Sequence, residues 1–160
     1  MKIEDYIEFN PKITINKKQL YKCIGMQDLQ PYTRLTTFSE ISLYKSGSKF
    51  QNGDTLFARI TPCLENGKTS FVDCLNNEEI GIGSTEFLVC RAREGKALPL
   101  FVYYLLCSKK VRNVAISSMI GSSGRERVQE IALKEMIIPE FSLELQRHIV
   151  DIRRVAYDCL

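Results

Sequence analysis

The sequence of 160 residues contains no tryptophan and a single histidine, His148. One histidine with no cysteine pair near it cannot supply the four clustered nitrogen and sulfur ligands of a structural zinc site. The six cysteines form no C-x-x-C pair, and the N-terminal residues lack the basic-then-apolar pattern of a signal peptide. We therefore expect buried, reduced thiols rather than a disulfide framework.

Long apolar runs are also missing from the sequence. The longest, over residues 97–107, includes Pro99 and is much shorter than the roughly 20 residues that span a bilayer. Hydrophobic residues make up 44% of the chain and charged residues 26%, which is typical of a globular domain and unlike a disordered one. These values predict a protein without a membrane segment, located in the cytoplasm.

The charge of the chain is small but unevenly distributed. There are 22 Lys and Arg against 19 Asp and Glu, which gives a net charge of +3. Residues 109–134 are the most basic stretch by density. Its basic residues are Lys109, Lys110, Arg112, Arg125, Arg127 and Lys134. Such a stretch either attracts a polyanion such as a nucleic acid or forms an ordinary solvated face.

Apolar–polar alternation predicts strands in the first part of the chain and helices in the second. The expected strands are Leu20–Met26, Asp54–Ile60, Thr69–Cys74 and Glu86–Arg91, with a loop over 76–83. Pro99 opens a helix expected over Leu100–Ala115, which a loop over 116–127 and a short strand near 136–138 follow. The order predicts an α/β fold of mixed α+β type, in which a twisted sheet carries a packed helix.

A final, protruding helix is expected to begin at Ser142. Apolar residues follow it at spacings of four and three, as in the seam of a coiled coil. They are Leu145, Ile149, Ile152, Ala156 and Cys159. The sequence therefore predicts a coiled-coil-type helix with a face for a partner.

Two short motifs suggest catalysis, and both have a simpler interpretation. Gly67-Lys68-Thr69 resembles the end of a phosphate-binding P-loop, but Pro62 stands where that loop needs its first glycine. Glu94-Gly95-Lys96 has the E-x-K spacing of metal-dependent nucleases, in which a carboxylate holds a divalent ion beside a lysine. The glycine at its centre equally suits a turn, so a nuclease stays an alternative function.

Basic and hydroxyl side chains suggest a nucleic-acid contact around the loop 121–127. The candidate DNA-binding residues are Arg59, Lys68, Ser122, Ser123, Arg125 and Arg127. Exposed amides and hydroxyls of a Gly-Ser-Ser-Gly run can bind phosphate oxygens, and arginine donates two parallel hydrogen bonds to them. For Arg59 and Lys68 a structural ion pair is an equal alternative, and the whole loop can also be a plain connection.

The longest of several motif segments is Gly53-Asp54-Thr55-Leu56-Phe57-Ala58-Arg59-Ile60-Thr61-Pro62-Cys63-Leu64-Glu65-Asn66-Gly67-Lys68. The others are Gly83-Ser84-Thr85-Glu86-Phe87, Met119 with Gly121-Ser122-Ser123-Gly124-Arg125-Glu126-Arg127-Val128, and Ile138-Pro139 before Leu145-Gln146-Arg147-His148-Ile149. These segments resemble one family, the specificity (S) subunits of type I restriction-modification enzymes. Their order matches too, and the resemblance covers about Tyr21 to His148.

The resemblance implies a DNA-reading module that does no chemistry and needs no cofactor. In such subunits each target recognition domain reads one half of a split DNA sequence. Helices pair as an antiparallel coiled coil and dock the methyltransferase (M) subunit and, through it, the restriction (R) subunit. Residues 1–140 would be the recognition domain and residues 141–160 the start of the spacer helix. An interaction protein that acts only through this helix stays a further alternative.

The chain departs from the family pattern in two respects. A full S subunit has two recognition domains and two long helices, whereas this chain has one domain and the start of one helix. Whether it is part of a longer subunit or a half-subunit that forms a homodimer stays open. The family usually has Glu-Gln where this chain has Leu145-Gln146. Base-reading residues vary within the family, and Tyr32, Arg34, Tyr44 and Lys45 are guesses from the early loops.

Overall fold

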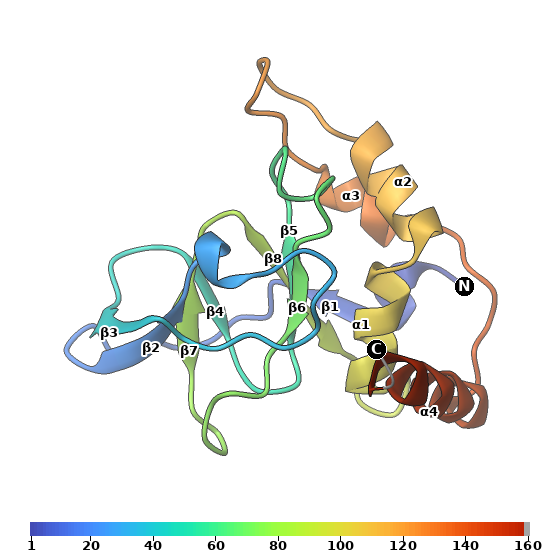
Figure 1. Cartoon of the computed structure of the whole chain (residues 1–160), viewed down its shortest axis with the longest axis horizontal. Coiled ribbons are helices and arrows are strands. Elements are labelled where there is room, and N and C mark those ends of the chain that lie inside the picture. Colours follow the sequence, from blue (N-terminus) through green and yellow to red (C-terminus); the bar gives the residue numbers. More distant parts are fainter. Residues whose placement is uncertain (159–160) are drawn as a thin grey trace.

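The strands form two four-stranded sheets, and the helices lie beyond one of them (Figure 1). The computed structural model describes residues 1–158. The large sheet has the order β1-β8-β5-β6 and is antiparallel, with β1 at Ile7–Phe9, β8 at Phe87–Ala92, β5 at Thr55–Ala58 and β6 at Thr69–Phe71. The small sheet has the order β3-β2-β7-β4, with β3 at Glu40–Leu43, β2 at Leu20–Ile24, β7 at Gly81–Gly83 and β4 at Ser48–Phe50. The mixed α/β class and all four expected strands are confirmed.

The large sheet is buried on both faces. All four residues of β5 are buried, and so are the first four of β8. One face packs on helix α1, Pro99–Leu106, through side chains such as Phe57 and Leu88. The other face packs towards the small sheet through Leu56 and Val89. A strand buried on both faces needs apolar residues at almost every position, which explains the nearly continuous apolar sequence of β5 and β8.

The single helix expected over Leu100–Ala115 is wrong, because two helices occupy this stretch. Helix α1 ends at Leu106, and α2 runs over Lys109–Ser117. Ser108 separates them, since its side-chain oxygen accepts a hydrogen bond from the backbone N–H of Val111 and so caps the start of α2. A serine cap supplies an acceptor to an otherwise unpaired N–H group, so a new helix begins there.

Two other expectations also need correction. Residues 81–83 form strand β7 instead of lying in a loop. Gly81 makes this possible, because a Cβ atom there would lie 2.4 Å from the ring of Phe50 on β4. Residues 136–138 form no strand; Ile137 makes only an isolated bridge to Lys2, and the short helix α3, Glu130–Lys134, precedes it. Two 3-10 turns, Ile3–Asp5 and Met26–Asp28, complete the regular elements described.

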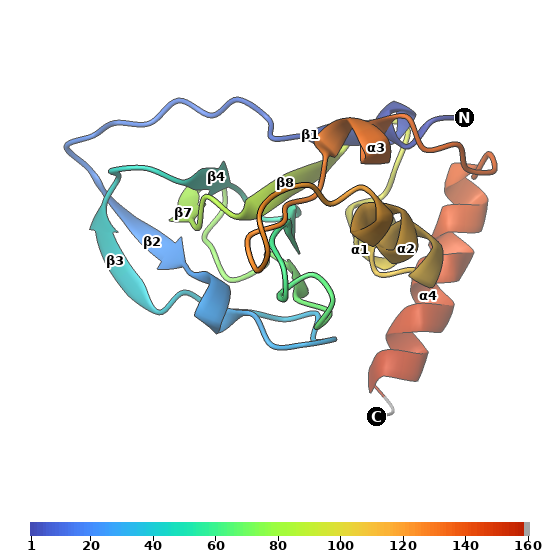
Figure 2. The ribbon, with the colours of Figure 1, turned by 90° about the horizontal axis from the view of Figure 1, so that it is seen from above.

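Helix α4, Leu143–Asp158, begins after Ser142 as expected. The buried amide of Gln146 accepts from the N–H of Leu98 at 2.9 Å and donates to the carbonyls of Lys96 and Phe141. The first part of α4 therefore packs beside α1 instead of protruding (Figure 2). No helix in residues 1–158 is long and apolar enough to cross a membrane.

The expected seam of α4 lies largely in solvent. Leu145 is 44% exposed and Ile152 is 68% exposed, whereas Ile149 is partly buried. Among residues 143–156 of the helix, Val150 is buried together with Gln146, and it lies on a neighbouring face. Cys159, the last seam position, lies outside the described residues. The helix thus offers apolar side chains for a partner, and pairing through them stays a prediction.

Candidate nucleic-acid interface

Two loops lie side by side at one end of the large sheet (Figure 1). One follows β5 and covers residues 59–68, and the other, residues 119–128, follows α2. Backbone hydrogen bonds join them: the N–H of Thr61 donates to the carbonyl of Glu126 at 3.0 Å, and the N–H of Val128 donates to the carbonyl of Arg59 at 2.8 Å. Because these bonds are at the base of the second loop, its tip is left free to project.

The tip of the second loop is exposed and carries three of the candidate residues. Ser122, Ser123 and Arg125 all lie on the surface. A turn in which the N–H of Arg125 donates to the carbonyl of Ser122 at 2.9 Å shapes the tip. The guanidinium of Arg125 forms no ion pair with any described residue. Its charge is therefore available to an anionic partner.

Arg127 is held at the base of the same loop by Glu86, the residue before β8. Its Nη2 lies 2.8 Å from Oε1 of Glu86, and its Nε donates to Oε2 at 2.9 Å. These hydrogen bonds lower the pKa of the Glu86 carboxyl and raise the pKa of the Arg127 guanidinium. The pair ties the loop to the large sheet, so Arg127 is less available to a ligand than Arg125.

Arg59 and Lys68 are partly occupied inside the protein. Nη2 of Arg59 donates to the carbonyl of Val128 at 3.3 Å, and Nζ of Lys68 donates to the carbonyl of Met26 at 3.2 Å. Neither forms a salt bridge within residues 1–158. DNA contact stays a prediction for all six candidate residues.

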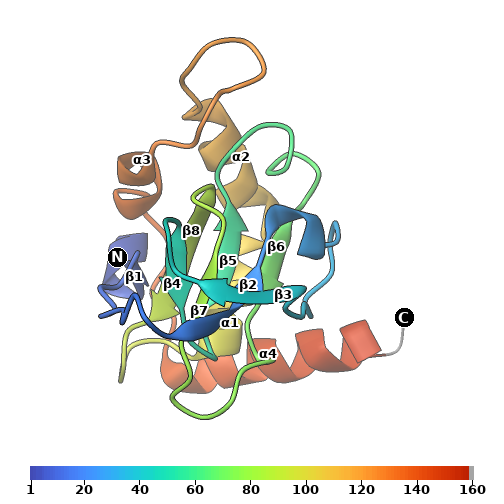
Figure 3. The same cartoon turned by 90° about the vertical axis from the view of Figure 1, so that its left-hand side faces the viewer.

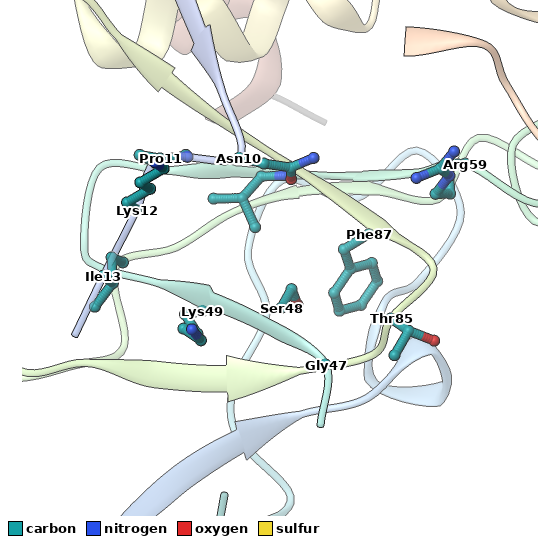
Figure 4. Close-up of a pocket in the computed structure, with 11 residues that line it drawn as sticks. Asn10, Pro11, Lys12, Ile13, Gly47, Ser48, Lys49, Arg59, Thr85 and Phe87 are labelled. Atoms are coloured by element: carbon teal, nitrogen blue, oxygen red, sulfur yellow. The ribbon is translucent and has the colours of Figure 1, made fainter. Parts of the chain in front are cut away.

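A pocket of about 580 Å³ lies between the two sheets, next to Arg59 (Figure 4). Its polar and charged lining includes Lys12, Ser48, Lys49, Arg59 and Thr85. Four of these residues are not among the predicted site residues, because only the folded sheets bring the distant segments 12–13, 47–49 and 85–89 together. Residues 1–50 contain more Lys and Arg than Asp and Glu. This excess of positive charge was the one feature of the sequence that could have pointed to Lys12 and Lys49.

A second hollow of about 910 Å³ lies over the small sheet and shares Thr85 with the first. Lys45 lines it, together with hydroxyl residues such as Ser39 and Ser42. Tyr44, also a guess for base reading, donates from its hydroxyl to the carbonyl of Gly47 at 3.0 Å. These segments form a polar surface that joins the pocket to the edge strand β3.

The other two early-loop residues lie elsewhere. The guanidinium carbon of Arg112 on α2 lies 4.9 Å from the ring centroid of Tyr32, near the first loop. The N–H of Phe71 on β6 donates to the backbone carbonyl of Arg34 at 2.8 Å. Their loop is therefore attached to the large sheet and α2, and base contact stays a guess for both residues.

The residues of the nuclease alternative lie in an exposed turn. Glu94 and Lys96 flank Gly95, whose φ of 73° is typical of a glycine turn. No group of three His, Cys, Asp or Glu side chains in residues 1–158 could hold a metal ion. The five cysteines in this part of the chain are free thiols, of which Cys23 and Cys90 are buried.

Comparison with curated proteins identifies relatives, although no family model matches the chain. It is 31% identical over 148 residues to the type I restriction enzyme EcoAI specificity subunit of Escherichia coli, covering 89% of this chain. It is also 30% identical over 95 residues to the EcoEI specificity subunit of the same organism, covering 59% of this chain. The chain is homologous to the specificity subunits of type I restriction enzymes.

Solved structures have the same fold as this chain. The HsdS subunit from Thermoanaerobacter tengcongensis superposes with a TM-score of 0.71 at 24% identity over 88% of this chain. A chain from a study of complex assembly and conformational transition of the type I R-M system gives 0.72 at 18% identity. The present chain spans 25% of EcoAI, 16% of EcoEI and 36% of each solved chain. The homology therefore covers one region the size of a single target recognition domain.

Proposed function

We propose that this chain is a target recognition module of a type I restriction-modification enzyme, which reads one half of a bipartite DNA sequence. The observation that carries the proposal is the 31% identity to a specificity subunit across 148 residues. The exposed Arg125 loop and the basic pocket beside Arg59 add support, since both offer positive charge to phosphates. The module itself performs no catalysis, needs no cofactor and works in the cytoplasm.

Within this proposal, residues 1–140 are the DNA-recognition domain and residues 141–160 begin the spacer helix. That helix docks the methyltransferase subunit, and through it the restriction subunit. The exposed Leu145 and Ile152 support such a role, because an apolar helix face in water gains free energy when a partner covers it. The same face also supports a homodimer, which would bring two recognition domains together.

A binding selection tests the proposed function. The chain, with its matching methyltransferase subunit, is mixed with a random-sequence duplex library at moderate salt, and the retained DNA is sequenced. Enrichment of a motif of about three to five base pairs would support a recognition module, and a split palindrome would also support a homodimer. Salt-dependent retention without any motif would contradict sequence reading and leave a generic basic surface.

The nuclease alternative predicts a different result. Cleavage of the same library in the presence of Mg²⁺, abolished in a Glu94→Gln variant, would establish it and overturn the proposed function. We expect no cleavage, because Glu94 lies in an exposed turn with no carboxylate cluster among the described residues.

A further inference from the structure

We propose that the pocket between the two sheets is a binding site for a phosphate group, in which Arg59 and Ser48 bind the oxygens of a nucleic-acid backbone. This inference rests on the proposed function for the source of the phosphate. The anion site itself is argued from the pocket alone.

The first argument is a pair of unsatisfied polar atoms. Nε of Arg59 and Oγ of Ser48 are both buried, and neither has a hydrogen-bond partner within the described part of the chain. Both residues line the same pocket. A buried donor without a partner costs about 1–3 kcal/mol, and more when it is charged, so a small side-chain shift that turns either group towards an acceptor in the pocket gains free energy.

The second argument is the charge of the lining. Lys12, Lys49 and Arg59 line the pocket, and no Asp or Glu lines it; the ammonium of Lys49 also lies 5.3 Å from the ring centroid of Tyr44. The nearby carboxylates are already engaged: Glu86 with Arg127, and Glu130 with Lys134 and with the side-chain amide of Asn10 at 3.2 Å. The nearby Arg59 guanidinium, after the hydrogen bonds from Arg127, also lowers the pKa of the Glu86 carboxyl. An anion is therefore favoured over a cation or a neutral ligand.

The third argument is size and shape. A volume of about 580 Å³ far exceeds the roughly 30 Å³ that one water molecule occupies, so a single water would not fill it. In the view of Figure 4, Ser48 and Phe87 lie between the two lysines on one side and Arg59 on the other. Several basic residues around one hollow of this size suit a chain of phosphates and sugars better than one isolated ion.

The backbone at Gly47 also contributes to the pocket wall. Its φ of 113° is a conformation that favours glycine, and a Cβ atom there would lie 2.0 Å from the carbonyl oxygen of Gly83. Gly47 therefore lets the start of β4 approach the segment that leads to Thr85. This close approach places Ser48 and Thr85 in the wall of one pocket.

Three charge-removing variants of the whole chain test the site. Arg59→Gln removes the central cation, and Lys12→Gln removes an exposed one, so that variant has no reason to misfold. Arg154→Gln is the matched control, because it lies on α4, at the opposite end of the molecule from the loop 119–128 (Figure 3). Binding to mixed-sequence duplexes is measured by fluorescence anisotropy at several salt concentrations. Circular dichroism checks the fold of each variant.

We expect Arg59→Gln to weaken binding about tenfold for every duplex sequence. The slope of log affinity against log salt should fall by about 0.9, which is the value for one lost phosphate contact. Lys12→Gln should lower the slope by a similar or smaller amount, and Arg154→Gln should leave it unchanged. An unchanged slope in both folded pocket variants would overturn the site, whatever the binding selection shows.

Inorganic phosphate and AMP distinguish the source of the phosphate. Each is titrated at constant ionic strength while the backbone amide signals of Gly47, Ser48 and Thr85 are followed by NMR. Shifts that compete with duplex DNA support the backbone assignment. Saturating shifts combined with unchanged DNA binding would overturn it in favour of a free phosphate compound. A uniform loss in Arg59→Gln without any enriched motif in the selection would support the pocket and contradict the proposed function.

Discussion

The two sheets have four strands each, yet they differ in how much of their side chains they bury. In the large sheet, β5 is buried along its whole length, and helices and the small sheet cover its two faces. In the small sheet, the edge strand β3 has no buried residue, and its Ile41 is 56% exposed. Because both faces of the large sheet are buried, few substitutions there would preserve its packing. The outer part of the small sheet can therefore vary in sequence at little cost to the fold.

A large difference in the free energy of unfolding is expected between the ion pairs of the two sheets. In the large sheet, Asp54 is 1% exposed and accepts two hydrogen bonds of 2.8 Å from Arg91 on β8. Asp54→Asn should lower the free energy of unfolding by about 3 kcal/mol, because it leaves the Arg91 charge without its partner. This value is the low end of the range for a buried pair, since the Arg91 side chain is 28% exposed. Urea denaturation measures the loss.

The matched variant in the small sheet is Glu79→Gln. Glu79 pairs with Lys22 on β2 at 2.9 Å, and both side chains are at least 20% exposed. Its loss should cost at most about 1 kcal/mol. Equal losses of the free energy of unfolding in the two variants would contradict the view that the large sheet tolerates substitutions less well than the small sheet.

A difference of at least similar size is expected for leucine truncation. Leu88 on β8 is fully buried, whereas Leu43 on β3 is 46% exposed. Leu88→Ala should cost about 2–5 kcal/mol, because it removes apolar contacts and leaves a cavity. Leu43→Ala should change the free energy of unfolding by about 0.5 kcal/mol or less. A large loss in Leu43→Ala would mean that another surface covers β3 in solution.

Sequence patterns predicted the large sheet better than the small one for the same physical reason. The strands β5 and β8 carry dense apolar residues, so their burial is visible in the sequence. Strand β7 is Gly-Ile-Gly, and glycine is rare in strands, so close packing against Phe50 could not be foreseen. The break at Ser108 was missed because apolar residues continue on both sides of the cap.

The candidate site was predictable only where its residues are close in sequence. The exposed loop around Arg125 was found, because glycine, serine and arginine stand together there. That Arg127 would pair with Glu86 was not predictable, since 41 residues separate them. The pocket beside Arg59 is assembled from still more distant segments, so its lysines had no local signal.

The ion pair that ties the loop 119–128 to the large sheet predicts that stability depends on pH. Because Arg127 lowers the pKa of Glu86, the pair stabilises the fold above the ordinary carboxyl pKa, and this stabilisation is lost as the pH falls through the lowered value. Glu86→Gln should therefore reduce stability at pH 7 by less than about 1 kcal/mol, because Arg127 is 44% exposed. The difference from the unchanged protein should shrink in thermal unfolding below about pH 4. A difference that is independent of pH would contradict the ion pair.

The smallest effect on stability, with a clear effect on binding, is expected at the loop tip. Arg125→Gln should change the free energy of unfolding by about 0.5 kcal/mol or less, because Arg125 is exposed and unpaired among the described residues. If Arg125 contacts a phosphate, the slope of log affinity against log salt should fall by about 0.9 in DNA titrations. Arg127→Gln is the matched comparison: it should lose the stability of the Glu86 pair and change the slope less. An unchanged slope in Arg125→Gln, and again in the double variant, would remove this loop from the interface and leave the pocket between the sheets as the basic contact.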